Sequence, residues 1–313
     1  MKIRMKENVY KEKRTWARFK AQIPLHLMML PGIITLIVFH IIPLTGLKLA
    51  FQFYVPAKGF WGDQKWVGFN NFKLLFMNPR FPLILRNTAV MAIGKVLFSM
   101  AVAVTFAILL NEVHNLKFRK TVQTIVYVPY FISWVVFGGI LMTILSPTSG
   151  VVGQIFNFFG LDAPYFLGDP KLFPGTIIAT DCWKEFGMDS IVYLAAILGV
   201  DPALHETASI DGANRFQRIW HITVPTMMPI ILLKLILAID NVLSAGFGQI
   251  LILLNDNVMS TGDIIDTYVY RVGLVQAQYG LSTATGLFKS VITAILTMVS
   301  YWLAHRYSNY KIW

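Results

Sequence analysis

The sequence has few charged residues and almost no cysteine. Only 14% of its 313 residues are charged, whereas 56% are apolar and the mean hydropathy is +0.59. This composition excludes an ordinary soluble globular domain and indicates an integral membrane protein with several spans. The single cysteine, Cys182, has no second cysteine in the chain with which to form a disulfide, so the sequence indicates no redox chemistry.

Motifs for nucleotide, metal and nucleic-acid binding are missing as well. The chain contains no G-x-x-x-x-G-K-[ST], so it lacks the signature of a loop that cradles ATP phosphates. It contains no H-E-x-x-H, and its six histidines are scattered. The net charge of +11 is not accompanied by a nucleic-acid-binding motif. We therefore expect no catalytic residue, no metal or cofactor bound by this chain, and no nucleic-acid partner.

Six apolar runs are each long enough to cross the hydrocarbon core of a bilayer, which takes about 20 helical residues. They cover residues 24–54, 88–111, 121–146, 173–199, 225–254 and 281–304. We predict an all-α, polytopic membrane protein with six transmembrane helices. The first run is too long for a signal-peptide core and has no convincing small-residue cleavage site, so we interpret it as a retained span. An even number of spans places both termini on one side.

Basic residues indicate which side is cytoplasmic. The first 20 residues contain eight Lys or Arg, and basic flanks face the cytoplasm. The outer loops at 147–172 and 255–280 carry one basic residue each. The outer segment 55–86 carries five, which weakens the bias, but long loops translocate largely regardless of charge. We expect both termini to be cytoplasmic, in the plasma membrane, with the net charge also attracting anionic lipid.

The chain divides into five parts by composition. These are a basic cytoplasmic arm at 1–23, a first span at 24–54, an extracellular segment at 55–86, a five-span core at 87–305 and a cytoplasmic tail at 306–313. The arm contains Trp16 and Phe19, which suit a membrane interface, but it is equally compatible with disorder.

A polar segment between the fourth and fifth runs has the signals of a short helix. Asp201 is a suitable N-cap, and Pro202 fits the first helical position, where its missing N–H costs nothing. Asp211 and Gly212 are expected to end this helix, because glycine adopts positive φ without a Cβ clash.

A second short helix is expected to follow. Phe216, Ile219 and Trp220 recur at spacings of three and four, which gives an apolar stripe, and Pro225 fits the first turn of the fifth span. Two short helices with apolar residues in water predict a projection that docks into a groove on a partner protein. An amphipathic loop lying on the bilayer is the alternative, although it does not need Gly212 and Pro225 at fixed offsets.

This segment resembles the EAA signature of permease subunits of bacterial ATP-binding-cassette (ABC) importers. That signature reads E-A-A, three residues, G, nine residues, I-x-L-P, and the chain matches it without a gap, with conservative departures at Thr207 and Val224. By this resemblance the ATPase-coupling residues are Glu206, Thr207, Ala208, Asp211, Gly212, Ala213, Ile222 and Pro225.

Other segments are similar to carbohydrate permeases related to those of the maltose transporter, and more closely to permeases for complex oligosaccharides. They are residues 66–72, the dipeptide Asn87-Thr88, residues 110–113 and residues 127–134. The resemblance implies one permease subunit of a type I importer, with 87–305 as its core. It also implies a second homologous permease, giving a heterodimer, a dimeric cytoplasmic ATPase that uses ATP and Mg, and an extracellular solute-binding lipoprotein.

Two other classes of protein are weighed against this interpretation. A secondary transporter or channel would work without an ATPase, but inverted repeats often show paired interrupted spans, and here the cytoplasmic motif is unpaired. A membrane-embedded enzyme would need a convergent set of His, Asp or Ser, which the scattered histidines do not supply.

Charged residues in the fourth run are candidates for the translocation path. Asp181, Glu185 and Asp189 recur every four residues and therefore share one helix face. Because buried charge is expensive in a membrane, that face is expected to line the path, with Trp183 offering an apolar surface to a sugar ring. A structural role is equally open, with Lys184 pairing to a carboxylate on a neighbouring helix.

The full set of path candidates is Asp181, Trp183, Lys184, Glu185, Asp189, Asp240 and Asn241, and Gln249 raises the same question. Four lysines within or beside apolar runs, Lys48, Lys95, Lys234 and Lys289, are expected to extend to the membrane interface.

Overall fold

The computed structural model describes residues 22–308, apart from the side chains of residues 240, 241 and 303–308. Most of the predicted arm at 1–23 and most of the tail at 306–313 lie outside the described residues. The described chain is largely helical, as predicted, with one two-stranded hairpin as the exception. Within it, four helices are long and apolar enough to cross a membrane, or up to six if each of two bent pairs is one span.

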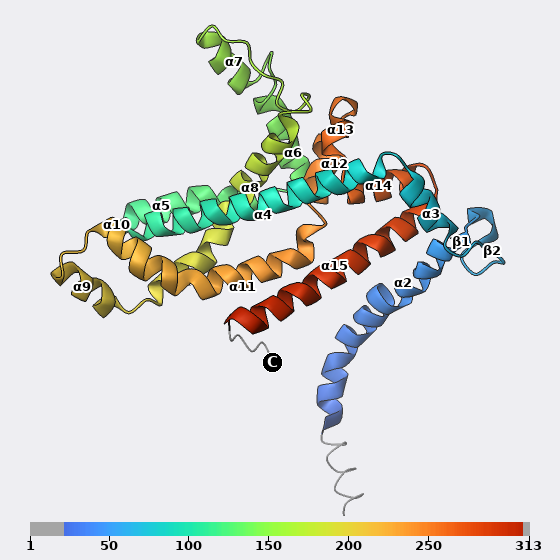
Figure 1. The fold of residues 1–313 in the computed structure, drawn as a ribbon, viewed down its shortest axis with the longest axis horizontal. Coiled ribbons are helices and arrows are strands. Elements are labelled where there is room, and N and C mark those ends of the chain that lie inside the picture. Colours follow the sequence, from blue (N-terminus) through green and yellow to red (C-terminus); the bar gives the residue numbers. More distant parts are fainter. Residues whose placement is uncertain (1–21, 309–313) are drawn as a thin grey trace, which may run out of the picture.

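The first long helix, Gln22–Phe51, stands apart from the rest of the chain over most of its length (Figure 1). It contains η1 (Ile37–Ile41), α2 (Ile42–Leu44) and η2 (Thr45–Phe51), and only η2 packs against the last helix, α15 (Tyr279–Ser308). No residue in its most apolar window is buried. An apolar helix of this kind requires lipid or a protein partner around it.

The segment after the first helix is a small folded unit. It comprises β1 (Gln52–Phe53), η3 (Pro56–Lys58), β2 (Lys65–Trp66) and α3 (Asn70–Met77), with the two strands antiparallel. Asn71 fixes α3 by donating to the carbonyls of Ala50 and Gln52 at 2.9 and 3.1 Å. The ring of Phe51 packs against those of Trp66, Phe69 and Phe72.

The second long helix, α4 (Phe81–Asn111), begins earlier than the apolar run that predicted it. Asn87 and Thr88 therefore lie inside the helix rather than at its start, and both are buried. The Asn87 amide donates to the carbonyls of Ser260 and Asp263, at 3.1 and 3.2 Å, and the Thr88 hydroxyl accepts from the Ile265 N–H. This dipeptide attaches a distant turn to α4.

The third apolar run, predicted as one transmembrane helix over 121–146, is bent into two helices. It forms α5 (Leu116–Tyr127), η4 (Val128–Phe131) and α6 (Trp134–Ile144), with 106° between the two parts. Pro129 cannot continue the helical hydrogen-bond ladder, and Ser133 starts α6 as its N-cap. After α6 the short α7 (Val151–Phe158) projects from the body (Figure 1).

The fourth run forms α8 (Phe173–Leu198), which is followed by α9 (Pro202–Ile210) at 68° to it. The next helix is continuous from Arg215 to Ile239 and includes α10 (Arg215–Arg218), η5 (Ile219–Thr223) and the start of α11 (Val224–Val242). The predicted second short helix, α10, is therefore continuous with the fifth span instead of separate from it. Pro225 lies in the first turn of α11, as predicted, although the continuous helix already begins at Arg215. The wider turn of η5 precedes Pro225 and accommodates its missing N–H.

The fifth run is also interrupted, contrary to the single span predicted at 225–254. Helix α11 ends at Val242 and α12 (Phe247–Leu253) follows a four-residue break. Ala245 and Gly246 have φ of +46° and +76° within this break. The remaining short elements before α15 are η6 (Asp256–Val258), α13 (Met259–Gly262), α14 (Ile265–Tyr270) and η7 (Arg271–Val275).

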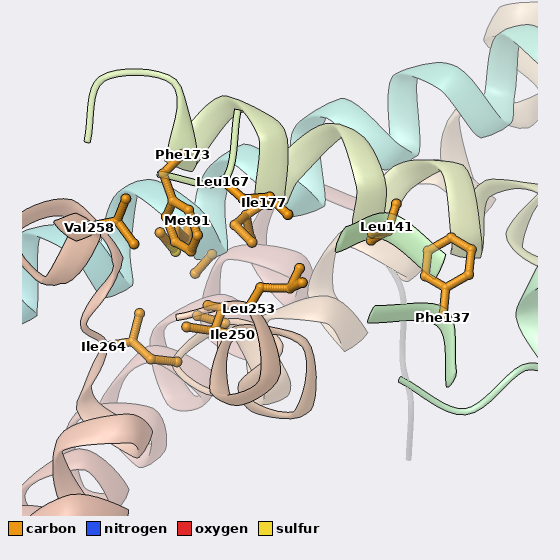
Figure 2. Packing of buried hydrophobic residues seen from close by; sticks show 12 residues of the cluster. Met91, Phe137, Leu141, Leu167, Phe173, Ile177, Ile250, Leu253, Val258 and Ile264 are labelled. Carbon is orange, nitrogen blue, oxygen red and sulfur yellow. The ribbon is translucent and has the colours of Figure 1, made fainter. Parts of the chain in front are cut away.

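The largest apolar cluster lies where α4, α6, α8 and α12 meet (Figure 2). It includes Met91, Phe137, Phe173 and Ile250, all nearly or fully buried. Glycine allows close helix contact here, because a Cβ on Gly138 would lie 2.7 Å from the side chain of Ile252. Between membrane helices such close packing, and not removal of apolar surface from water, supplies much of the attraction.

Candidate translocation path and coupling loop

The loop after α8 is built by the local signals that predicted it. The Asp201 carboxylate accepts a hydrogen bond from the Ala203 N–H at 3.0 Å, and α9 begins at Pro202. The helix ends at Ile210, and Gly212 follows with φ of +81°. The N-cap and the glycine turn are therefore confirmed.

A capping box starts the next helix. Asn214 accepts from the Gln217 N–H at 2.9 Å, and the Gln217 side chain accepts from the Asn214 N–H at 2.8 Å. The rings of Phe216 and Trp220 stack along this helix, with centroids 6.3 Å apart. The apolar stripe predicted at this position is present, although it lies on the first turns of a long helix.

The loop presents apolar side chains at the surface. Ile210 and Phe216 are 86% and 72% exposed, and Leu204 and Trp220 are exposed as well. In Figure 1, α9 lies at one end of the molecule and the β1–β2 hairpin lies at the other. Most of the residues predicted from the EAA resemblance are exposed, namely Glu206, Thr207, Asp211, Gly212 and Pro225, whereas Ala208, Ala213 and Ile222 are half-buried.

The path candidates of α8 lie on a common cavity. Asp181, Glu185 and Asp189 line a space of about 350 Å³, together with side chains of α4 and α11. The prediction that these carboxylates share one face is confirmed. The same cavity is lined by Lys95 and Lys234.

Each of these carboxylates is paired with a lysine. The Nζ–Oδ1 distance is 2.9 Å for Lys95 with Asp181 and 2.8 Å for Lys234 with Asp189. Lys289 of α15 is likewise paired with an aspartate of α14. The expectation that these three lysines extend to the interface is therefore wrong, because a carboxylate on another helix compensates each ammonium within the bundle. The fourth, Lys48, lies over aromatic rings.

Lys184 and Trp183 lie off this cavity. The Lys184 ammonium donates to the Tyr130 carbonyl at 2.9 Å, and it lies 3.2 Å from Glu185, so its carboxylate partner is not on a neighbouring helix as the structural alternative proposed. It also lies over the rings of Tyr130 and Trp134. Trp183 is 45% exposed and its ring packs against Phe137, at 5.2 Å between centroids.

Of the polar candidates in the fifth run, only Gln249 has a described side chain. The side chains of Asp240 and Asn241 lie outside the described residues. Gln249 of α12 is fully buried and hydrogen-bonded to Lys95 and Thr180. Sequence reasoning missed the roles of Lys95, Tyr130 and Trp134 in this arrangement. The signal for Lys95 was present, because a charge inside an apolar run requires a partner.

Similarity to known proteins identifies the family of this chain. Residues 103–309 match a family model described as the binding-protein-dependent transport system inner membrane component. The chain belongs to this family. The permease is 39% identical to the polygalacturonan/rhamnogalacturonan transport system permease protein YteP of Bacillus subtilis, over 97% of this chain and 94% of YteP. It is also 39% identical to the protein LplB of Bacillus subtilis, over 91% of this chain and 89% of LplB.

Solved structures agree with this assignment. The permease superposes with a TM-score of 0.87 on a chain of a bacterial ABC transporter involved in the import of the acidic polysaccharide alginate. The two are 38% identical, and the match covers 94% of this chain and 99% of that one. A second structure of the alginate transporter, in complex with an alginate pentasaccharide-bound periplasmic protein, matches with a TM-score of 0.85.

These similarities confirm the resemblance found in the sequence. The chain is a permease, a transport subunit of the membrane component of an ABC importer and a homologue of permeases for sugars. A secondary transporter, a channel and a membrane-embedded enzyme are not supported by any of these matches.

Proposed function

We propose that this permease forms the translocation path of an ATP-driven importer for an oligosaccharide, of acidic class. The observation that carries the proposal is a charged cavity between α4, α8 and α11 in a chain that also bears an exposed apolar projection. Two relatives, the polygalacturonan/rhamnogalacturonan permease YteP and the importer of the acidic polysaccharide alginate, support the substrate class.

The coupling loop, residues 201–225, binds a dimeric cytoplasmic ATPase. The ATPase hydrolyses ATP with Mg, and the permease does no covalent chemistry. Ile210 and Phe216 supply apolar surface for a groove on the ATPase, and Glu206 supplies an exposed carboxylate beside them. Gly212 sets the turn between the two helices. Closure of the ATPase pushes on this loop and switches the cavity between outward-facing and inward-facing states.

The path itself runs along α8. The carboxylates of Asp181, Glu185 and Asp189 accept hydrogen bonds from sugar hydroxyls, while Lys95 and Lys234 keep the cavity close to neutral. Trp183 offers a half-exposed ring that packs against Phe137, as an apolar platform for a pyranose. Lys184, Asp240 and Asn241 remain candidates of the same path.

The permease spans the plasma membrane six times, with α5 and α6 together as the third span, α8 as the fourth and both termini in the cytoplasm. The basic first 20 residues and the position of α9 opposite the β1–β2 hairpin support this orientation. The division at 1–23, 24–54, 55–86, 87–305 and 306–313 is retained as a proposal. A second permease, related but different, covers the exposed first helix and completes the path, and an extracellular binding protein delivers the substrate.

Reconstitution tests the whole proposal. The permease is expressed with the candidate second permease and ATPase, purified through a tag on the permease alone, and placed in proteoliposomes. We expect both partners to copurify and uptake to require ATP and the binding protein. Uronate oligosaccharides should be taken up, and neutral ones of the same length should not. Uptake without ATPase would contradict the importer, and preference for a neutral sugar would contradict the substrate class alone.

A further inference from the structure

The break between α11 and α12 is contacted by lysines from two other helices. A Cβ on Gly246 would overlap the Lys95 ammonium, so α4 reaches the break from one direction. Lys289 of α15 donates to the Ser244 hydroxyl at 3.2 Å. We propose that Lys95 and Lys289 clamp this break, and that the clamp carries motion from α11 into α12 and the elements packed around it. The proposal rests on the coupling function proposed above.

The first half of the clamp joins three helices at the break. Lys95 of α4 donates to the Asp181 carboxylate of α8 at 2.9 Å and to the side-chain carbonyl of Gln249 of α12. The Gln249 amide in turn donates to the Ile177 carbonyl and the Thr180 hydroxyl of α8, at 3.0 and 2.9 Å. Gln249 is thereby fully satisfied and fully buried.

The second half joins the break to the last two helices. The Lys289 ammonium lies 2.7 Å from both carboxylate oxygens of Asp266 in α14, and it also contacts Ser244. Both charges are largely covered, at 18% and 21% side-chain exposure. Ion pairs in such surroundings keep one geometry, because separation would leave an uncompensated charge.

A clamp is mechanically required here because the helix itself stops. From Arg215 to Ile239 the chain is one continuous helix. A displacement of the coupling loop therefore moves this helix as a rigid unit. At the break the helical hydrogen-bond ladder ends, and Ala245 and Gly246 adopt left-handed conformations. A bare break of this kind bends under load. Lys95 and Lys289 tie it to α4, α8, α14 and α15, so that α11 and α12 move as one body.

Distance measurement in the complete importer tests this directly. Spin labels are placed at Leu232→Cys on α11 and Leu251→Cys on α12, both exposed positions outside the path cavity, in a Cys182→Ala background with cysteine-free partners. Pulsed EPR then records the label distance without nucleotide and in the vanadate-trapped state. We expect one narrow distance that is the same in both states.

Charge-neutral pairs remove each half of the clamp without leaving a lone charge. Lys289→Met with Asp266→Asn should broaden the distance distribution and lower transport per ATP hydrolysed about tenfold, and neither residue lines the proposed path. Lys95→Met with Asp181→Asn should broaden it similarly. Gly246→Ala should also broaden it, whereas Gly248→Ala is the matched control, because a Cβ there makes only an ordinary 3.6 Å contact with Trp134.

Two results would overturn the clamp. One is a label distance that differs between the two states in the unsubstituted protein, because the break would then be a hinge. The other is a narrow distance and normal coupling in both neutral-pair variants. Failure of the proposed function is distinguishable, since it would abolish ATP-dependent uptake in the unsubstituted importer whatever the label distances show.

Discussion

Gly212 has a backbone conformation that residues with a side chain rarely adopt. It has φ of +81° at the turn after α9, with open space around it. A β-branched residue in this conformation costs about 1–2 kcal/mol or more. We predict that Gly212→Val leaves membrane insertion intact and lowers ATPase association about tenfold, measured by copurification and by substrate-stimulated ATP hydrolysis. Gly212→Asn, which tolerates positive φ, should retain most of the coupling. Normal coupling in Gly212→Val would show that the conformation of this turn is not needed for coupling.

Trp183 is the path candidate whose replacement is expected to disturb the fold least. Its ring is half-exposed and contacts Phe137, and it forms no part of the charge pairs. We predict that Trp183→Ala lowers uptake at least fivefold with little change in yield of the assembled complex. Val192→Ala, at another exposed position of α8, is the matched control. Equal uptake by the two variants would show that Trp183 serves packing and does not contact the transported sugar.

Replacing Lys95 is expected to affect stability strongly, because it leaves the Asp181 carboxylate without its counter-ion. Asp181 and Gln249 both lose their donor in Lys95→Met. Breaking a buried pair by removing one partner costs about 3–5 kcal/mol. We predict a clear fall in the unfolding temperature of the assembled complex, and recovery of most of it in Lys95→Met with Asp181→Asn. A stable Lys95→Met protein would show that water or lipid headgroups already compensate Asp181.

At the scale of the element, α9 is a short helix whose exposed apolar residues are proposed to bind the ATPase. Ile210 is 86% exposed, so replacing it changes few contacts within this chain. We predict that Ile210→Ser weakens ATPase binding about tenfold, measured by titration of the ATPase onto immobilised permease, with unchanged thermal stability of the permease. Ser209→Ala on the same helix should bind normally. Equal binding by the two variants would place the contact elsewhere.

Local chemistry made some elements predictable. The N-cap at Asp201, the turn at Gly212 and the shared face of three α8 carboxylates depend only on spacing and on neighbouring residues. The family segments were also informative, because Asn87 and Thr88 form contacts that fix a distant turn. The first kind of signal lies within a few residues of the feature that it specifies, whereas the contacts of Asn87 and Thr88 reach residues 260–265 and could not be read from the sequence.

Breaks in the apolar runs were not predictable by the same reasoning. Hydropathy is continuous through Ser133 and through Gly246, yet the chain bends by 106° at the first and leaves the helical conformation at the second. The bend before α6 follows a local proline, Pro129, which hydropathy does not register, whereas the break at Gly246 is contacted by Lys95 of another helix. A run length therefore sets how much chain can cross the membrane, but not whether it crosses as one helix.

At the scale of the whole molecule, ion pairs between helices join the segments that surround the candidate path. Pairing across helices was recognisable as a need from the sequence, but the partners were not, since Lys95 and Asp181 are 86 positions apart and Lys234 and Asp189 are 45 apart. These pairs join α4, α8 and α11 around the cavity. Tertiary structure alone decides which lysine neutralises which carboxylate.

The central claim is that the α9 projection faces the cytoplasm and touches an ATPase that drives transport. Site-specific crosslinking tests it most directly, with Ile210→Cys as the reactive position, Cys182→Ala as the background and a single cysteine in the ATPase groove. The account predicts a crosslink that forms in inverted vesicles, blocks ATP-driven uptake and is reversed by reductant. Labelling of Ile210→Cys by an impermeant reagent added outside intact cells would contradict it.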